Sequence, residues 1–267
     1  MSNLSIGVFD SGLGGLTVLK VLRDHFPNES FIYLGDTARL PYGSKSPDTI
    51  HRYAKQNIDF LSHLKIKAVV VACNSASAAL RSQPLIAPPV PILEVILPGS
   101  EAALSATSTG RIGVVGTYAT VAQSAYVKCL QSLSPDIKVF QQACPLLVPL
   151  VEEGWIDDPL TSLVVNRYVA LLIQHQIDTL ILGCTHYPVL KTTFEKVVGR
   201  DVQLIDSGEA IASRLHAAMA SGHVAPSNSK QGSFEIYTTD KTARFAEIAA
   251  YLLGEQNIPP VEVVDIT

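Results

Sequence analysis

The sequence lacks the features of a membrane-bound, secreted or nucleic-acid-binding protein. Its apolar runs are well short of the ~18–20 residues that a membrane helix needs. Its first residues carry no basic segment followed by an apolar run and a small-residue cleavage site, as a signal peptide would. No cluster of Lys and Arg stands out, and the net charge is -4. We therefore expect a cytoplasmic protein with neither a membrane nor a nucleic acid as its partner.

Cysteine is scarce, and no two cysteines form a CxxC pair. Structural zinc sites are built from such pairs, so we expect no bound metal. In a reducing compartment we expect free thiols rather than disulfides. Cys129 lies in a helix-like stretch and Cys144 precedes Pro145, so we interpret both as structural. The other two are Cys73 and Cys184.

What is present is an alternation of short apolar runs with helix-like segments. Hydrophobic residues make up 47% and charged residues 16% of the 267 residues, which fits a folded protein with room for two domains. Continuous apolar runs are typical of parallel strands covered on both faces. These runs are Ile6–Phe9, Phe31–Leu34, Ala68–Ala72, Ile112–Val115 and Thr179–Leu182.

Two helices are indicated most clearly between these runs. Ser46 and Pro47 are typical of the N-cap and first residue of a helix, and apolar residues follow at helical spacing as far as Leu64. A second helical face runs from Leu160 to Leu172. Alternating strands and helices predict an α/β fold with mostly parallel sheets.

A faint internal repeat divides the chain. Ile6–Ser11 resembles Ile112–Thr117, and Val69–Asn74 aligns with Leu180–Thr185. The repeat predicts two similar α/β domains, although strand–turn–helix units recur in all α/β proteins and leave duplication open. In each domain a cysteine would follow the C-terminal end of a strand, where open α/β sheets place ligands. The active site is therefore expected in the cleft between the domains.

The domain boundaries are expected at two crossings of the chain. The proline-rich stretch Pro84–Pro98 is typical of a connecting segment with a short strand inside, so the first boundary is expected near Pro98-Gly99. A second crossing is expected near residues 206–208. The first domain would then contain residues 1–97 plus 208–267, and the second residues 98–207.

Cys73 and Cys184 stand out because each ends an apolar strand and precedes small polar residues, Asn74-Ser75 and Thr185-His186. Each polar pair is expected to open a helix, where backbone N–H groups bind carboxylates and lower a thiol pKa. One such cysteine alone is more often a small buried hydrophobe. Two in matching positions favour a functional role.

Two thiols on facing domains have three uses: a disulfide, a metal site or proton transfer. A disulfide would join the domains in a reducing compartment, and a metal needs more ligands than two thiols and one His. Inverting a stereocentre needs a base on one face and an acid on the other. Sulfurs about 3–3.5 Å from one carbon would lie roughly 7 Å apart, too far for an S–S bond of about 2.05 Å. With an ordinary thiol pKa near ~8.5, a thiolate and a thiol coexist at neutral pH with modest help.

Five segments resemble the signature segments of glutamate racemases, in the same order and spacing, between about residue 6 and residue 210. They are Asp10–Thr17, Gly35–Gly43, Ala72–Ala78, Cys144–Gly154 and Leu182–Pro188. Each alone is a weak signal, but together they are specific. The resemblance implies a cofactor-independent enzyme of the aspartate/glutamate racemase family. Such an enzyme interconverts L- and D-glutamate and supplies D-glutamate for peptidoglycan, and so for the bacterial cell wall and cell shape.

The resemblance also implies a role for each matched residue. Cys73 would deprotonate D-glutamate with the assistance of Asp10. Cys184 would deprotonate L-glutamate, with His186 as its partner and Glu152 supporting that histidine. The implied substrate-binding residues are Asn74, Ser75, Thr117 and Thr185 for the α-carboxylate and amino group, Ser11, Tyr42 and Gly43 for the side-chain carboxylate, and Asp10 and His186 beside them.

The residue types predict that the two thiols are activated differently. A carboxylate repels a neighbouring thiolate, so Asp10 has to act as a proton acceptor or by binding the substrate ammonium. A protonated His186 favours a neighbouring thiolate directly. A simpler interpretation makes Asp10 a turn or N-cap residue and Glu152 a solvated residue at a helix start. The pH profiles of the two directions would test the asymmetry.

Other residues of the matched segments have structural interpretations. Gly12, Gly14 and Gly15 fit a tight turn close to the substrate, since Thr17 breaks a G-x-G-x-x-G nucleotide motif. Asp36 and Arg39 are expected to pair and brace the loop that carries Tyr42. The sequence departs from the family pattern at Ser75, Glu94 and Leu97, where a threonine, a small residue and a polar residue are usual.

Three functions compete. The first is a glutamate racemase, and the second is a racemase for aspartate or another acidic substrate. The third is a two-lobed binding protein that closes on an acidic ligand without turning it over. The Pro41-Tyr42-Gly43 loop and the Thr185-His186 pair favour glutamate as the small-molecule substrate. The sequence leaves the oligomeric state open, with a homodimer as one candidate.

Overall fold

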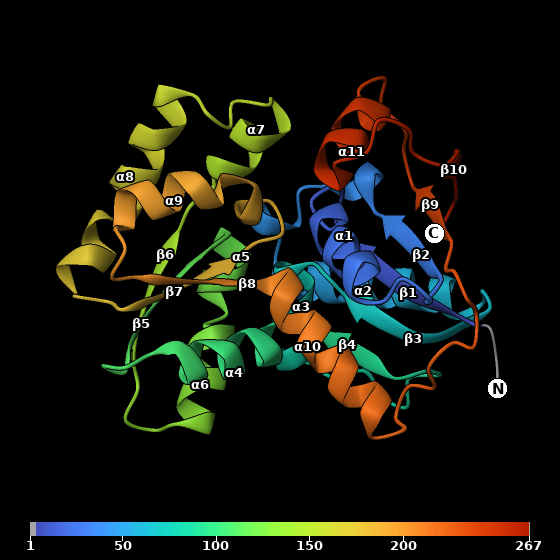
Figure 1. Ribbon diagram of the computed structural model, residues 1–267, viewed down its shortest axis with the longest axis horizontal. Coiled ribbons are helices and arrows are strands. Elements are labelled where there is room, and N and C mark those ends of the chain that lie inside the picture. The colour runs from blue at the N-terminus through green and yellow to red at the C-terminus, as the bar shows by residue number, and fades with distance from the viewer. Residues whose placement is uncertain (1–3, 267) are drawn as a thin grey trace.

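Two parallel sheets organise the chain, whose computed structural model describes residues 4–266 (Figure 1). The larger sheet has the strand order β10-β9-β2-β1-β3-β4, and the smaller has the order β6-β5-β7-β8. The larger contains β1 (Ser5–Asp10), β2 (Phe31–Gly35), β3 (Ile66–Val71), β4 (Ile92–Glu94), β9 (Phe234–Thr238) and β10 (Val261–Val263). The smaller contains β5 (Arg111–Gly116), β6 (Lys138–Ala143), β7 (Thr179–Gly183) and β8 (Gln203–Asp206).

The two sheets repeat one arrangement of strands. The order β2-β1-β3-β4 in the first recurs as β6-β5-β7-β8 in the second, and every strand pair is parallel. The five apolar runs of the sequence form β1, β2, β3, β5 and β7. The predicted α/β fold of two similar domains with parallel sheets is therefore confirmed. The first sheet is extended by β9 and β10, which come from the last part of the chain.

Helices cover both faces of each sheet because successive side chains of a strand point to opposite faces. On β1, Ile6 and Val8 pack in one core with Leu19, whereas Phe9 packs in another with Ile58. The helices of the first sheet are α1 (Leu16–His25), α2 (Pro47–Ser62), α3 (Asn74–Ser82), α10 (Ser207–Ala220) and α11 (Phe245–Leu253). Those of the second are α4 (Ile96–Ala106), α5 (Tyr118–Ala122), α6 (Ala125–Leu133), α7 (Leu147–Glu152), α8 (Pro159–Gln174) and α9 (Lys191–Val198).

Both predicted helices begin with a polar N-cap residue, which the sequence analysis anticipates for the first of them. Ser46 caps α2 by accepting a hydrogen bond from the backbone N–H of Thr49, and Pro47 is the first helical residue. In α8, Asp158 caps the helix by accepting a bond of 2.7 Å from the N–H of Leu160. In both, a polar N-cap satisfies a backbone N–H group that would otherwise have no partner.

The first crossing between the sheets is the connecting segment for which the sequence predicts a short strand and a domain boundary near Pro98-Gly99. Its short strand is present as β4, but α4 begins at Ile96, so both residues lie inside a helix. Proline is tolerated there because the N–H groups of a first helical turn have no intrahelical partner. Glu94, which departs from the family pattern, starts this helix by accepting bonds from the N–H groups of Ile96 (2.6 Å) and Leu97 (3.2 Å).

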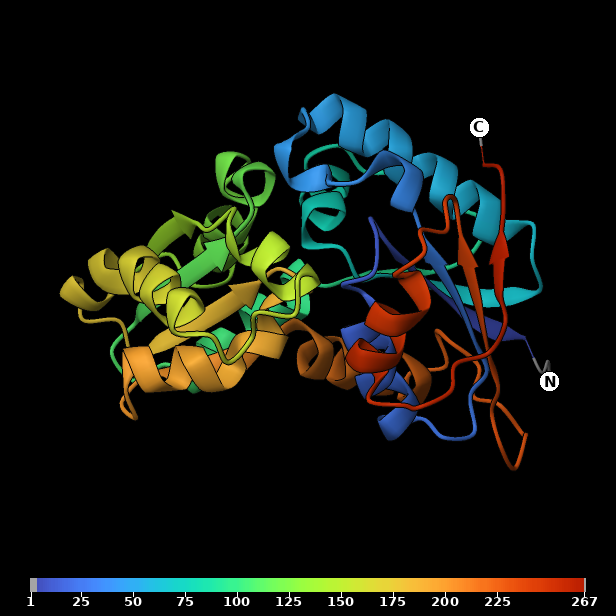
Figure 2. The same cartoon turned by 90° about the horizontal axis from the view of Figure 1, so that it is seen from above.

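The two domains lie side by side, with α10 at their junction (Figures 1 and 2). This helix packs against α1 in one direction and against α4 in the other. Seen from above, the second sheet and its helices form one lobe and the first sheet with the chain end forms the other (Figure 2). Within residues 4–266, no helix has both the length and the apolar character to cross a bilayer.

Candidate active site

The predicted site residues gather because parallel strands end at the same edge of their sheets. In the first sheet, β1 and β3 are neighbours, and the N–H of Ala72 donates to the carbonyl of Phe9 over 2.9 Å. This pairing sets Asp10 beside Cys73. In the second sheet, β5 and β7 are neighbours and place Thr117 near Cys184 in the same way. The two cysteines therefore follow equivalent strands, β3 and β7.

A cavity of about 360 Å³ lies between these strand ends. All the predicted site residues line it except Asp10, which is fully buried behind it. The lining within the described part of the chain contains no Lys or Arg. The wall consists of Ser11, Gly12, Leu40, Pro41, Tyr42, Gly43, Ser44, Cys73, Asn74, Ser75, Thr117, Tyr118, Pro145, Val148, Pro149, Glu152, Cys184, Thr185 and His186.

The thiols of Cys73 and Cys184 are both buried and both free of disulfide bonds. They line the same cavity from different domains. Their charges act on each other, since a thiolate at Cys184 contributes to raising the pKa of Cys73. The two sheets therefore each contribute one free thiol to the wall of the same cavity.

Cys73 lies in surroundings that favour its protonated form. Burial, followed by the charge of Asp10, raises the pKa of its thiol to about 12. Two hydrogen-bond contacts oppose this shift: the thiol donates to the hydroxyl oxygen of Ser11 over 3.5 Å, and the backbone N–H of Ala76 contacts the sulfur. Cys73 is also the N-cap residue of α3, so the polar pair after it opens a helix as predicted.

Asp10 is a buried carboxylate held by neutral donors. Its oxygens accept bonds from the N–H of Gly12 at 2.9 Å and from the hydroxyl of Thr185 at 3.3 Å, so it connects the two domains. Burial raises the pKa of its carboxyl group, and the charge of His186 opposes that shift. A carboxyl group with a raised pKa is suited to exchanging a proton.

His186 connects Cys184 to Glu152. Its Nδ1 lies 3.9 Å from the sulfur of Cys184, and its Nε2 lies 3.1 Å from a carboxylate oxygen of Glu152 at the end of α7. Burial alone would lower the pKa of His186, but the contacts with Cys184 and Glu152 outweigh it and raise the pKa to about 10. The imidazole is therefore charged at neutral pH and directs a proton at the sulfur.

The segment after Cys184 differs from the predicted helix start. Thr185 and His186 precede a 3-10 turn, Tyr187–Leu190, and α9 begins only at Lys191. The side chains of this pair serve the site instead: Thr185 binds Asp10, and His186 binds Glu152.

Asn74 presents a free acceptor next to Cys73. Its amide nitrogen donates to the hydroxyl of Tyr126 at 2.9 Å and to Ser207 at 3.2 Å. Its carbonyl oxygen is buried and has no hydrogen-bond partner among residues 4–266. A buried acceptor without a partner costs free energy, so this oxygen is placed to receive a donor from a bound molecule.

Hydroxyl groups form a second polar patch on the cavity wall. The hydroxyl oxygens of Ser75 and Thr117 lie 2.9 Å apart, although they belong to different domains. Thr120 lies 3.1 Å from Thr117 and 3.4 Å from Ser75. Serine in place of the family's usual threonine at position 75 therefore keeps a hydroxyl in this cluster.

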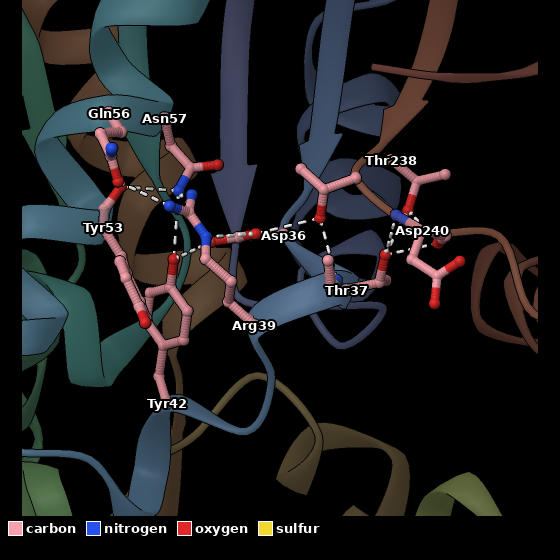
Figure 3. Close-up of polar contacts among 11 residues, drawn as sticks. Asp36, Thr37, Arg39, Tyr42, Tyr53, Gln56, Asn57, Thr238 and Asp240 are labelled. Carbon is pink, nitrogen blue, oxygen red and sulfur yellow. Dashed lines mark hydrogen bonds and ion pairs between the residues drawn. The ribbon is translucent and has the colours of Figure 1, made fainter. Parts of the chain in front are cut away.

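Tyr42 does not offer its hydroxyl to the cavity. That hydroxyl donates to the buried carboxylate of Asp36, which Arg39 also binds, so the predicted bracing pair is present (Figure 3). The short helical turn Tyr42–Ser44 is thereby held against the cavity. A Cβ atom at Gly43 would lie 2.7 Å from the Cβ of Thr117, so only glycine permits this approach of the two domains.

Several residues of the site carry no signal in the sequence. Tyr126 and Ser207 orient Asn74, and Tyr118 lines the cavity, yet none of the three belongs to the five matched segments. They reach the site only through the packing of α6, α10 and α5 against the sheets. No group of three or more His, Cys, Asp or Glu residues within residues 4–266 is arranged to hold a metal ion.

Comparison with known proteins identifies the family. The sequence model of the Asp/Glu/Hydantoin racemase family matches residues 17–215. The chain belongs to this family. A relative of this racemase, the glutamate racemase of Syntrophus aciditrophicus, is 43% identical over 261 residues, which cover 98% of this chain and 96% of the relative.

Solved racemase structures share its fold over the whole length. Glutamate racemase isoform RacE1 from Bacillus anthracis superposes with a TM-score of 0.92 at 37% identity, covering 98% of this chain and 97% of that one. Glutamate racemase from Francisella tularensis, solved in complex with D-glutamate, gives a TM-score of 0.89 at 33% identity, with 100% and 99% coverage.

Proposed function

We propose that this racemase interconverts L- and D-glutamate by moving the Cα proton between Cys73 and Cys184. The observation that carries the proposal is the placement of two free thiols, after equivalent strands of two domains, on the walls of one cavity. The relatives named above, at up to 43% identity, are glutamate racemases and support the choice of substrate.

In the L-to-D direction, the thiolate of Cys184 removes the Cα proton while the carbon's electron pair moves onto the α-carboxylate. The thiol of Cys73 then delivers its proton to the opposite face, and the electron pair returns to the carbon. The sulfurs end with their protons exchanged, and the D-to-L direction reverses each step. Charged His186 supports this by stabilising the thiolate of Cys184, and Glu152 fixes the histidine.

The cavity wall matches the polar groups of glutamate. The partnerless carbonyl oxygen of Asn74 accepts from the substrate ammonium. The hydroxyls of Ser75, Thr117 and Thr185 donate to the α-carboxylate. Ser11 and the backbone of Tyr42 and Gly43 donate to the side-chain carboxylate. Because no Lys or Arg lines the cavity, these neutral donors and His186 carry the recognition.

Asp10 assists Cys73 through the substrate rather than through its own field. Its charge raises the pKa of the Cys73 thiol, which opposes thiolate formation. The substrate ammonium, bound nearby, compensates that charge and lowers the cost of a thiolate. Asp10 then accepts a proton or holds the ammonium as the reaction demands.

We assign residues 1–97 plus 208–267 to the first domain and 98–207 to the second. The assignment is supported by the sheets, which draw on residues 5–94 with 234–263 and on residues 111–206. Residues 1–3 and 267 lie outside the described part of the chain. D-glutamate made by a cytoplasmic enzyme of this kind would supply peptidoglycan synthesis.

The test is solvent exchange at Cα. The protein is mixed with L-glutamate in D2O, the Cα proton is followed by NMR and the optical activity by circular dichroism, and aspartate is run in parallel. We expect loss of the Cα proton signal and decay of optical activity with glutamate, and far slower change with aspartate. Binding without exchange would contradict racemisation, and faster turnover of aspartate would contradict the substrate.

A further inference from the structure

Asp36 gathers donors from three parts of the chain behind the cavity wall. Its side chain is fully buried, follows β2 and does not line the cavity. Arg39 binds both carboxylate oxygens through Nε, at 2.7 and 2.9 Å, and Asn57 of α2 donates over 3.2 Å. The hydroxyl of Thr239 donates over 3.0 Å, and the hydroxyl of Tyr42 is a further donor (Figure 3).

This carboxylate fixes the loop that forms one end of the cavity. The ring of Tyr42 is buried, and its hydroxyl interacts with Asp36 and, at 3.1 Å, with Asn57. The backbone of Tyr42 and Gly43 is thereby left at the cavity, opposite Thr117 of the second domain. A shift of the Tyr42 hydroxyl would move the donors for the side-chain carboxylate directly.

Arg39 anchors the same loop to α2. Its Nη1 donates to Gln56 over 2.6 Å, and its guanidinium lies 4.3 Å from the ring centre of Tyr53. Figure 3 shows these side chains on one side of Asp36 and Thr238 on the other.

The other anchor comes from the segment after β9. Besides binding Asp36, Thr239 accepts from the N–H of Ala38 over 2.9 Å. The hydroxyl of Thr37 contacts the hydroxyl of Thr238 at 2.6 Å and accepts from the N–H of Asp240 over 2.9 Å. The last part of the chain therefore supports the loop without reaching the cavity.

We propose that Asp36 is a positioning residue, which sets the place of the Tyr42-Gly43 backbone and so the affinity for the side-chain carboxylate of the substrate. This inference rests on the proposed glutamate racemase function. Asp36 acts only through Tyr42 and its loop, because it touches neither the cavity nor the thiols. Its loss weakens substrate binding more than it slows proton transfer between the sulfurs.

A buried carboxylate that only stabilises the fold would behave differently, and the chain offers a matched control. Glu29 is also buried, pairs with Lys67 and accepts from the N–H of Ser227 over 2.6 Å. It precedes the same strand, β2, that Asp36 follows, and so lies at the opposite edge of the sheet. Glu29→Gln and Asp36→Asn each remove one buried, paired charge, but only the second faces the substrate loop.

The experiment compares kcat and KM for L-glutamate in both variants, with thermal unfolding in parallel. For Asp36→Asn we expect KM to rise at least about tenfold while kcat falls less than about threefold. For Glu29→Gln we expect an unchanged KM, even if its melting temperature falls by as much as that of Asp36→Asn. An unchanged KM in Asp36→Asn, or an equal rise in Glu29→Gln, would overturn the proposal. Absence of turnover in the wild type would instead refute the proposed function.

Tyr42→Phe tests the proposal even if Asp36→Asn folds poorly, and a double-mutant cycle shows whether the two residues act through one contact. Tyr42→Phe removes only the hydroxyl that Asp36 holds, so we expect it to raise KM as well. If both residues act through one contact, the KM of the double variant should be no higher than that of the single variant with the higher KM. Additive losses would show that the hydroxyl of Tyr42 and the carboxylate of Asp36 act separately, and would contradict the positioning role.

Discussion

Cys73 and Cys184 are chemically unequal although they follow equivalent strands. Cys184 faces a charged imidazole, whereas Cys73 faces a buried carboxylate and has a pKa raised to about 12. In the free enzyme the thiol of Cys73 therefore keeps its proton. The proposed inversion requires such a proton donor, because one sulfur has to give a proton while the other receives one.

Removing either sulfur should stop racemisation. Because general acid–base catalysis contributes about 10²–10⁴-fold, we expect Cys73→Ala and Cys184→Ala each to lose at least about a thousandfold in turnover, with circular dichroism of the backbone unchanged. Cys129→Ala, in α6 and outside the cavity, should keep nearly full activity. Retained racemisation in either of the first two variants would refute the two-base scheme.

The pH dependence of kcat should differ between the D-to-L and L-to-D directions, whereas that of kcat/KM should not. D- and L-glutamate are equally stable, so kcat/KM has to be the same for both at every pH. The D-to-L direction needs the thiolate of Cys73, and a pKa raised to about 12 means that the thiolate fraction grows as pH rises. Between about pH 8 and 10, kcat from D-glutamate should rise more steeply than kcat from L-glutamate.

Asp10→Asn tests the cause of the pH dependence of kcat from D-glutamate. The charge of Asp10 raises the pKa of Cys73, so its removal should move the alkaline rise of kcat from D-glutamate to lower pH. The position of the rise is the readout, since the maximum rate will also fall. Superimposable kcat profiles for both enantiomers in the wild type would contradict the asymmetry.

At the scale of elements, the turn between β1 and α1 brings the domains together. A Cβ atom at Gly14 would lie 2.4 Å from Nδ1 of His186 and 2.5 Å from the hydroxyl oxygen of Thr185. The glycine therefore permits the close approach that the sequence pattern suggested. It does so against His186 of the other domain rather than against the substrate.

Gly14→Ala should accordingly impair catalysis through His186. We expect kcat to fall at least about tenfold, because displacement of a positioned group by a fraction of an ångström is costly. Gly99→Ala is the control, since its new Cβ would meet only Tyr126 at 3.4 Å inside α4. Steady-state kinetics and the pKa of His186 from NMR would measure both, and an unaltered histidine in Gly14→Ala would contradict this account.

The elements that the sequence predicts are those with strong local signals. Buried parallel strands are continuously apolar, which marks β1, β2, β3, β5 and β7, and the Ser46-Pro47 pair marks the start of α2. Pro98 does not distinguish a connecting segment from a helix start, because proline is common both in linkers and in the first turn of a helix. The short or half-exposed strands β6, β8, β9 and β10 lack such runs and are visible only in the fold.

The residues of the site, like the strands and helices, can be predicted only where the sequence carries a local signal. Residues that follow apolar strands, such as Asp10, Cys73 and Cys184, are predicted because strand ends converge. The contacts of Asp36 with Thr239, and of Asn74 with Ser207, join parts of the chain more than a hundred residues apart. No local pattern encodes such pairs, so they follow only from the packing of β9 beside β2 and of α10 between the domains.

At the scale of the molecule, a substrate held by both domains should stabilise them together. Asn74 and Thr185 line the cavity from different domains, so bound glutamate would add contacts that the unfolded chain lacks. At about 100 times the dissociation constant, a ligand adds about 2.7 kcal/mol, which corresponds to a rise of about 5–10 °C in melting temperature for a chain of this size.

Racemic glutamate is the suitable ligand for that measurement because its turnover causes no net change. Glutarate lacks the ammonium group that Asn74 and Asp10 would bind, and should give a clearly smaller rise at the same concentration. Equal stabilisation by the two compounds in a thermal shift assay would contradict the assignment of the ammonium site.

The pairing of β9 with β2 determines the order in which the two sheets can be completed during synthesis on the ribosome. The second sheet comes from one uninterrupted stretch and can close as soon as β8 has emerged. The first sheet has to wait for β9, which at about 5–20 residues per second follows β2 by roughly 10–40 s. Cys73 and Cys184 are therefore both synthesised well before Thr239 can bind Asp36. In a nascent chain both thiols are present before the loop that carries Tyr42 is held in place.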